Sequence, residues 1–250
     1  MTEPAEPLRK FGVIDFSHSD PLASFLSSRY EVRRAHPSKI LEMVKSGELD
    51  LGMVSLVSYL ENREALRLVE GPTIHSLSGT ISTLLVSSGN PMGTPMKIAV
   101  TSHTRTTEFY LDQIMRKLGI RTELIHCDFT EAHDLLEKAD YALVIGDEAL
   151  RAFNSGCRIL LDIGRQFSVN FGLPPVYAVT VTATDVKSLP EIDITNLDDA
   201  VEKHASNMVS ESSKRVGVSI QLMERYFTNI CYSFTDEVRN TIGFVGRAIH

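Results

Sequence analysis

The chain has 250 residues, of which 43% are apolar, enough to fill the core of one large domain or of two small lobes. Its formal net charge of −7 argues against nucleic acid as a partner, because neutralising phosphates requires clustered Lys and Arg side chains. Its three cysteines lie far apart without a CxxC spacing, so the sequence indicates neither a disulfide framework nor a zinc site.

The first ten residues, MTEPAEPLRK, are polar and are followed by only a short apolar run. They lack the apolar region of a secretion signal, and no apolar run in the chain approaches the length that spans a membrane. We therefore expect a cytoplasmic protein with no membrane partner. The sequence is compatible with a monomer and with a homodimer.

The first quarter of the chain alternates strand-like and helix-like segments, which differ in the spacing of their apolar residues. The expected strands are residues 11–16, 30–34 and 49–55, and the expected helices are residues 21–26, 39–48 and 57–64. This βαβ order predicts a mainly parallel sheet that is covered by helices.

A candidate anion-binding loop lies between the next two expected strands. Residues 66–69 and 80–86 are the strands, and residues 71–79 are a polar loop. The loop offers hydroxyl groups and exposed backbone N–H groups, which together can bind an anion, although ordinary surface loops have a similar composition. We expect Ser76 and Ser78 to hold one carboxylate of a ligand.

Residues 89–96, GNPMGTPM, contain two prolines and two glycines, and we predict that the chain crosses here into a second lobe. The βαβ pattern then restarts, with expected strands at 97–102, 121–127, 141–147 and 157–163 and expected helices at 104–118, 130–139 and 148–154. Residues 166–174 are predicted as a loop. A strand at 177–183 returns toward the first lobe, and the pattern from residue 196 onward is helical.

Two βαβ lobes joined by two crossings describe an α/β, two-lobed, periplasmic-binding-protein-like fold of type II. The predicted first lobe comprises residues 8–90 and 180–250, with the helical tail packed on it, and the second lobe comprises residues 91–179. In open α/β sheets, ligands bind beyond the carboxyl ends of the strands. In a two-lobed protein, that position is the cleft between the lobes.

Segments along nearly the whole chain resemble one known family. They are PSKILEMVKSGELDLGMVSLVSYLENREALRLVEG, TIHSLSGTISTLLVSS, KIAVTSHT, YALVIGDEAL, LLDIGRQFSVNFGLPPVYAV and YFTNICYSFTDEVRNTIGFVGR. Together, and in this order, they resemble the chorismate dehydratases of menaquinone biosynthesis, a family of the futalosine route. The resemblance extends from about Phe11 to Arg247.

The resemblance implies removal of water from chorismate to give 3-enolpyruvylbenzoate, without a metal or other cofactor. It also implies that the substrate, a small carboxylate, is held between the lobes. Hydroxyl-bearing loops and helix N-termini are suited to receive its two carboxylates. The candidate substrate-binding residues are Ser55, Ser76, Ser78, Ser102, Thr104, Arg105, Gly146, Asp147 and Asn170.

His18 is the candidate catalytic residue, and it departs from the family pattern. Where the family usually has an asparagine before a Pro-Leu pair, this chain reads FSHSDPL. A histidine can hydrogen-bond as an amide does, and unlike asparagine it can also take a proton near neutral pH. The alternative is a histidine of a surface turn.

The segment Ser102-His103-Thr104-Arg105 stands where the family usually has Ser-x-Thr-Ser at the start of a helix. Ser102 and Thr104 match this pattern, and their alternative role is to cap the helix. Arg105 replaces a serine. It can reach a substrate carboxylate in a bidentate manner, or it is solvated beside Glu108.

Other candidates carry a structural alternative as well. Glu148 is more typical of a helix N-terminus than of a ligand site, and His75 is a single loop histidine. Phe167, Asn170 and Phe171 form an aromatic wall for a ring substrate, or else belong to the core.

Three classes of function follow. The first is an enzyme, either a chorismate dehydratase or its sister in the same route, a 1,4-dihydroxy-6-naphthoate synthase. The second is a non-catalytic protein that binds a small carboxylate, and the third is a ligand-sensing domain. The lack of an export signal argues against the second class, and the lack of a DNA-binding segment argues against the third.

Overall fold

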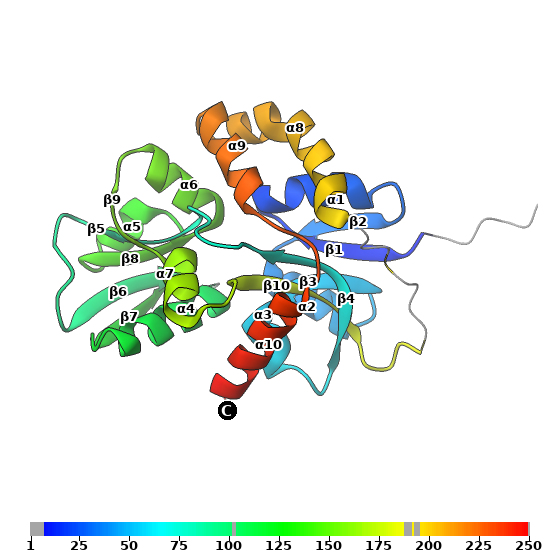
Figure 1. Cartoon of the computed structure of the whole chain (residues 1–250), viewed down its shortest axis with the longest axis horizontal. Coiled ribbons are helices and arrows are strands. Elements are labelled where there is room, and N and C mark those ends of the chain that lie inside the picture. The colour runs from blue at the N-terminus through cyan, green and yellow to red at the C-terminus, as the bar shows by residue number, and fades with distance from the viewer. Residues whose placement is uncertain (1–7, 102–103, 188–191, 193–195, 250) are drawn as a thin grey trace, which may run out of the picture.

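The computed structural model describes residues 8–101, 104–187, 192 and 196–249, which form two α/β lobes side by side (Figure 1). The sheet of the first lobe has the strand order β2-β1-β3-β10-β4. Its strands are β1 (Lys10–Ile14), β2 (Glu31–Ala35), β3 (Leu51–Ser55), β4 (Leu66–His75) and β10 (Val176–Ala183). Its helices are α1 (Asp20–Leu26), α2 (Pro37–Lys45) and α3 (Leu56–Glu61).

The second sheet repeats this topology with the order β7-β6-β8-β5-β9. Its strands are β5 (Thr83–Ser87), β6 (Met96–Thr101), β7 (Thr122–Cys127), β8 (Tyr141–Ile145) and β9 (Arg158–Asp162). Its helices are α4 (Arg105–Lys117), α5 (Ala132–Leu136), α6 (Gly146–Asn154) and α7 (Ile163–Phe171). Both sheets are mixed, because β10 and β5 each run antiparallel to their two neighbours. The expectation of mainly parallel sheets is therefore wrong at these two strands.

The crossings between the lobes differ from the predicted ones. Strand β5 pairs with β8 and β9 in the second sheet, so the chain leaves the first lobe within residues 76–82. The GNPMGTPM segment connects β5 to β6 inside the second lobe. Strand β10 lies wholly in the first sheet. The predicted divisions at residues 90 and 179 therefore cut the chain about ten residues too late and in the middle of a strand, respectively.

Local sequence explains the better predicted elements. Helix α2 begins with Pro37, whose fixed φ suits the first turn, and it buries Ile40, Met43 and Val44 along one face. It ends just before Gly47, which has a φ of 74°. This left-handed conformation favours glycine, and it stops the helix.

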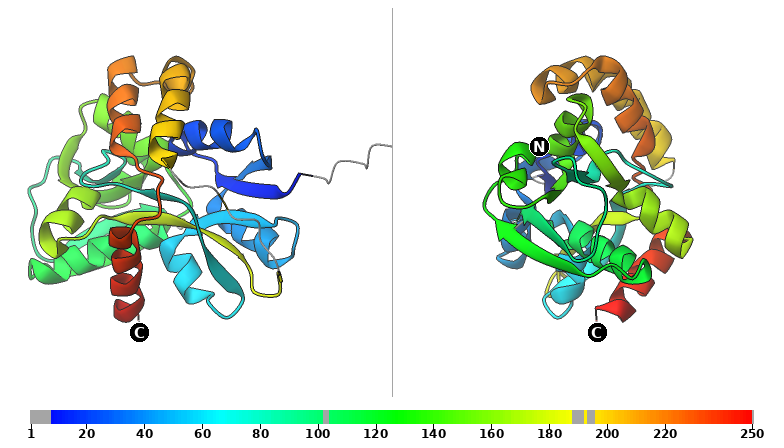
Figure 2. Two further views of the ribbon diagram at one scale, coloured as in Figure 1. Left: turned by 45° about the vertical axis from the view of Figure 1, so that its right-hand side comes forward. Right: turned by 90° about the vertical axis from the view of Figure 1, so that its left-hand side faces the viewer.

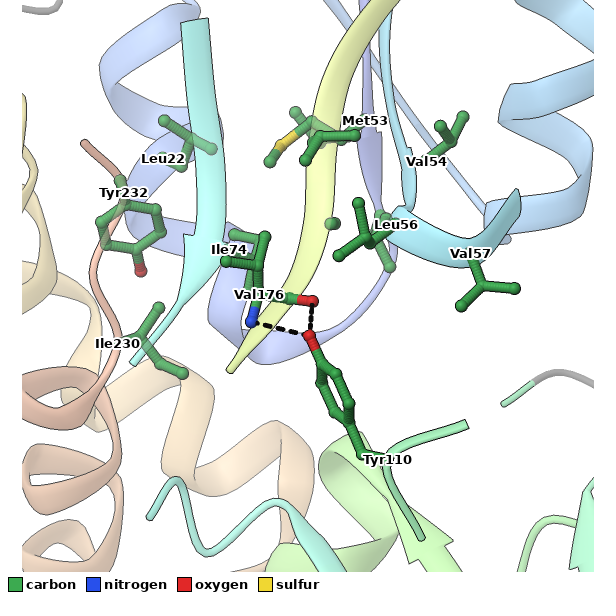
Figure 3. Packing of buried hydrophobic residues seen from close by; sticks show 14 of the residues in the cluster. Leu22, Met53, Val54, Leu56, Val57, Ile74, Tyr110, Val176, Ile230 and Tyr232 are labelled. Atoms are coloured by element: carbon green, nitrogen blue, oxygen red, sulfur yellow. Dashed lines mark hydrogen bonds between the residues drawn. The ribbon is translucent and has the colours of Figure 1, made fainter. Parts of the chain in front are cut away.

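The apolar core is continuous between the two lobes. Tyr110 of α4 is fully buried, and its hydroxyl donates to the carbonyl of Val176 at 2.7 Å and accepts from the N–H of Val176 at 3.0 Å (Figure 3). Apolar side chains of the first lobe, such as Ile74 and Leu56, lie near this contact (Figure 3). The second-lobe helix α4 is thus anchored to the start of β10.

The chain ends in three helices, α8 (Leu197–Val216), α9 (Ile220–Asn229) and α10 (Asp236–Ala248). Helices α8 and α9 pack on each other and stand on one side of the molecule, while α10 lies on the other (Figures 1 and 2). As expected, the tail packs on the first lobe, with α8 on α1 and α10 on α3, and α8 also contacts α6 of the second lobe. No helix within the described ranges is long and apolar enough to cross a membrane.

Candidate active site

A pocket lies between the two lobes, and both lobes contribute to its walls. The empty space that it encloses is about 590 Å³ when the open mouth is included. Ile14, Ile74, Ile145 and Ile230 make much of the wall apolar. The polar and aromatic lining residues are Phe16, His18, Ser55, Ser82, Thr83, Thr104, Arg105, Thr106, Thr107, Tyr177 and Tyr226. The pocket therefore suits a ring compound that carries a few polar groups.

His18 lies in the short 3₁₀ helix η1 (Ser17–Ser19), which follows β1 and leads directly into α1. Its Nδ1 lies 3.3 Å from the hydroxyl of Tyr226, and the hydroxyl of Tyr232 donates to its backbone carbonyl at 2.8 Å. Its Nε2 is buried and has no hydrogen-bond partner in the described part of the chain. A buried ring nitrogen without a partner in a pocket wall is free to contact a ligand.

Burial lowers the pKa of His18 to about 4, and the nearby carboxylates of Asp147 and Asp20 oppose this shift only in part. His75 has its pKa lowered to about 4 by burial as well. A buried imidazole loses more hydration when it is charged than when it is neutral. At neutral pH both rings are therefore uncharged.

These two histidines predict a loss of stability in acid. Below pH 6.5 the unfolded chain binds protons that the folded chain binds only near pH 4, so the free energy of unfolding falls across this interval. The loss is on the order of 3 kcal/mol for each histidine. Urea unfolding at a series of pH values measures it. In His75→Gln, which lacks one of these histidines, the free energy of unfolding is expected to fall less steeply with decreasing pH than in the parent. An equally steep fall would contradict the lowered pKa of His75.

Helix α4 points its N-terminus at the pocket. Thr104 precedes the helix, is 3% exposed, and has a hydroxyl with no partner among the residues described. The first backbone N–H groups of a helix have no intrahelical acceptor and carry partial positive charge, so they attract an anion. In two neighbouring helices one such group is already bonded, because Ser58 N–H donates to the Ser55 hydroxyl and Gly146 N–H donates to the Ser82 carbonyl.

The same turn of α4 also holds the two lobes together. The hydroxyl of Thr106 accepts from the backbone N–H of Val57 in α3 at 3.1 Å. Arg105 forms an ion pair with Glu61 at the end of α3. About half of the Arg105 side chain is exposed, so it stands at the mouth of the pocket.

A second inter-lobe contact fixes the turn that carries His18. The backbone N–H and the hydroxyl of Ser17 both donate to one carboxylate oxygen of Asp147 in α6, at 3.0 and 2.5 Å. Arg215 of α8 lies 3.7 Å from the other oxygen of Asp147 and also pairs with Asp20. Asp147 therefore ties the second lobe to the residue next to His18.

Residues 10–245 match the profile of a family described as menaquinone biosynthesis. The chain belongs to this family. One curated relative is the chorismate dehydratase of Thermus thermophilus, which is 25% identical over 143 residues. The matched region covers 57% of this chain and 52% of that protein, so it spans about half the length of the relative.

Solved structures confirm the predicted two-lobed fold. The periplasmic aliphatic sulphonate-binding protein SsuA of Escherichia coli superimposes with a TM-score of 0.70 at 13% identity, covering 98% of this chain and 87% of that one. The alkanesulfonate-binding protein SsuA of Xanthomonas axonopodis pv. citri, bound to MOPS, gives 0.69 at 13% identity, with 97% and 91% covered. A protein of Archaeoglobus fulgidus gives 0.68 at 13% identity, with 96% of both chains covered.

Five of the site residues that were predicted from the sequence line the pocket. They are His18, Ser55, Thr104, Arg105 and Gly146. Ser102 lies outside the described residues. The loops that follow the strands of both sheets thus converge as the fold class predicts.

Four selected residues do not line the pocket. Ser76 is buried and donates its hydroxyl to the carbonyl of Ser78, and Ser78 itself is exposed beside a different hollow. Asp147 is engaged by Ser17. Asn170 donates to the carbonyl of Gln166 within α7. The expected anion-binding loop is also shorter than predicted, because β4 continues to His75.

The predicted aromatic wall belongs to the core. Residues 163–171 form helix α7, which replaces most of the loop predicted at 166–174. The carboxylate of Asp162 caps this helix by accepting from Arg165 N–H at 3.0 Å. Phe167 is fully buried, with its ring 4.1 Å from that of Tyr110 between centroids. An aromatic side chain on the buried face of a helix packs there instead of facing a ligand.

Two tyrosines of the pocket were missed from the sequence. Tyr226 lies on α9 among apolar residues at helical spacing, a pattern that indicates core. Tyr177 is the second residue of β10, and its hydroxyl lies 3.4 Å from that of Thr83. Burial raises the pKa of both phenols, so both remain protonated. Only the folded structure brings these rings to the lobe boundary.

Tyr177 depends on a glycine that leaves room for it. A Cβ atom at Gly164 in α7 would lie 2.2 Å from the Tyr177 hydroxyl oxygen. We expect Gly164→Ala to destabilise the protein by about 1–3 kcal/mol, because the clash outweighs the gain in helix propensity. Denaturant unfolding measures the change.

Gly243→Ala in α10 is the matched control, since the nearest atom to its added Cβ would be 3.5 Å away. It is expected to leave stability unchanged or to raise it by up to about 1 kcal/mol. Equal effects of the two substitutions would contradict the close approach of Tyr177 to Gly164.

Proposed function

We propose that the protein is a lyase of the chorismate dehydratase type, acting in the cytoplasm in the futalosine route of menaquinone biosynthesis. It would remove water from chorismate to give 3-enolpyruvylbenzoate. The observation that carries the proposal is the pocket between the lobes of a menaquinone-biosynthesis family member. In its wall lies the Nε2 of His18, which has no hydrogen-bond partner among the described residues. The chorismate dehydratase of Thermus thermophilus supports the choice of substrate.

The proposed binding mode follows from the charges of chorismate. One carboxylate meets the N-terminus of α4, where Thr104 supplies a hydroxyl and the first turn supplies backbone N–H groups. Arg105 stands at the mouth, where it attracts the anionic substrate. The ring then packs against the isoleucine side chains of the wall.

The proposed reaction removes two groups from neighbouring ring carbons. The carbon that bears the enolpyruvyl ether loses a proton, the C–H electron pair becomes a ring π bond, and the next carbon loses hydroxide. Proton and hydroxide leave as water, and the ring becomes aromatic. Since the ring already has two double bonds, no oxidant or reductant is required, and we propose no cofactor. His18 acts at this centre, and the proton is taken either by its imidazole or by a carboxylate of the substrate.

The direct test is incubation of the purified protein with chorismate. We expect loss of the absorbance of the ring diene and appearance of an aromatic product whose mass is that of chorismate less one water. Absence of turnover over a range of pH would refute the dehydratase proposal. Binding of chorismate without turnover would instead indicate a carboxylate-binding protein, and turnover of a cyclic futalosine derivative alone would indicate the sister enzyme.

A further inference from the structure

The hydrogen-bond partner of Nδ1 in His18 determines whether Nε2 carries the ring proton. A neutral imidazole carries one proton, so one ring nitrogen donates a hydrogen bond and the other accepts one. The proton position is set by the partner of the second nitrogen. In this structure that partner is Tyr226, whose hydroxyl lies 3.3 Å from Nδ1.

Between a phenol and a neutral imidazole, the phenol is the better donor and the imidazole nitrogen is the better acceptor. The Tyr226 side chain is fully buried, and Nδ1 of His18 lies within hydrogen-bond distance of its hydroxyl, so the phenol proton goes to Nδ1. This arrangement leaves the proton of His18 on Nε2.

The charged groups around the ring are occupied elsewhere. Asp147 accepts from Ser17 and faces Arg215, and Asp20 pairs with Arg34 and Arg215 and accepts from Ser212. The hydroxyl of Tyr232 donates to the backbone carbonyl of His18 and not to its ring. The ring, nine-tenths buried, thus meets a neutral partner at Nδ1 and none at Nε2 within the part of the chain that is described.

We propose that Tyr226 is a positioning residue that holds His18 as the Nε2–H tautomer, so that His18 donates a hydrogen bond to the departing hydroxyl and does not remove the ring proton. This inference rests on the proposed function for the identity of the acceptor. The ring proton then passes to a carboxylate of the substrate and from there to the departing hydroxide, and the imidazole is unchanged at the end.

The tautomer is tested on the full chain labelled with ¹⁵N-histidine. Long-range ¹H–¹⁵N correlation spectra distinguish protonated from unprotonated ring nitrogens, and His18→Gln identifies the His18 signals by their absence. We expect a protonated Nε2 in the parent and in Tyr232→Phe, which removes a buried hydroxyl that does not touch the ring. Tyr226→Phe is expected to give a mixture of tautomers. A protonated Nδ1 in the parent, or unchanged signals in Tyr226→Phe, would overturn the proposal.

Turnover tests the donor role separately. Gln places an amide N–H near the position of Nε2 but cannot take a proton at neutral pH. His18→Gln is expected to retain kcat within about tenfold of the parent and well above that of His18→Ala, as fits the loss of part of one hydrogen bond. Equal inactivity of the Gln and Ala variants, both folded by their unfolding midpoints, would refute the donor role. If the parent itself does not turn chorismate over, the proposed function fails, while the spectra still decide the tautomer.

Discussion

Replacing His18 with alanine is expected to lower kcat for chorismate by about 10²–10³-fold, the usual effect of removing one preorganised donor at a reacting oxygen. The KM should change far less, because the carboxylate is held at the N-terminus of α4 and the ring by the apolar wall. Steady-state kinetics with chorismate measure both quantities.

His133→Ala is the matched control for that substitution. Its side chain is 82% exposed and lies on α5, away from the lobe boundary. We expect kinetic constants within twofold of the parent for this variant, as is roughly usual for a surface position. Intact activity of His18→Ala would show that His18 is only a residue of the turn.

Asp147→Ala is expected to lower the free energy of unfolding by about 2–4 kcal/mol, because it leaves two donors of the fully buried Ser17 without an acceptor. It should also reduce kcat, since the turn that carries His18 loses its tie to the second lobe. Urea unfolding and chorismate kinetics measure the two effects.

Asp112→Ala provides the comparison for Asp147→Ala. Asp112 pairs with Arg116 one turn away on the exposed face of α4, and such pairs contribute little. We expect a change below about 0.5 kcal/mol and normal kinetics. If Asp147→Ala behaved in the same way, Asp147 would have no part in holding the lobes or His18.

Elements that depend on interactions between residues close in the sequence were predicted better than those that depend on residues far apart in it. Helix α2, with its N-terminal proline and its glycine stop, and strands such as β1 and β6 are fixed by local spacing and were predicted within a few residues. Strand β5 was assigned to the wrong lobe, because its pairing with β8 and β9 depends on residues more than fifty positions away. The segment GNPMGTPM has the highest local content of proline and glycine and was therefore predicted as the crossing, but it is a loop within the second lobe.

The first crossing between the lobes, within residues 76–82, is not marked by prolines or by a glycine-rich composition. Ile81 has a φ of 54°, a left-handed conformation that is rare for a β-branched residue, and its N–H donates to Asp162 at 2.9 Å. A Cβ at Gly79 would lie 2.6 Å from the Asp162 carboxylate, so glycine is needed there. Both requirements come from contacts with the second lobe, and the sequence alone does not contain them.

The candidate site shows the same division. Residues at strand ends, such as His18, Ser55 and Thr104, were found because the fold class brings those ends together. Tyr177 and Tyr226 line the pocket although their sequence patterns indicate core elements. Asp147 was predicted to bind substrate, but its carboxylate accepts a hydrogen bond from Ser17 instead. The partner of Nδ1, and with it the proton position on His18, follows only from the packing of α9 over the turn.

A crystal structure of His18→Ala soaked with chorismate tests whether chorismate is converted in the pocket between the lobes, beside His18. We expect intact chorismate in that pocket, with one carboxylate at the N-terminus of α4 and the ring hydroxyl facing the space left by the imidazole. Chorismate bound elsewhere, or an empty pocket at millimolar chorismate, would contradict it.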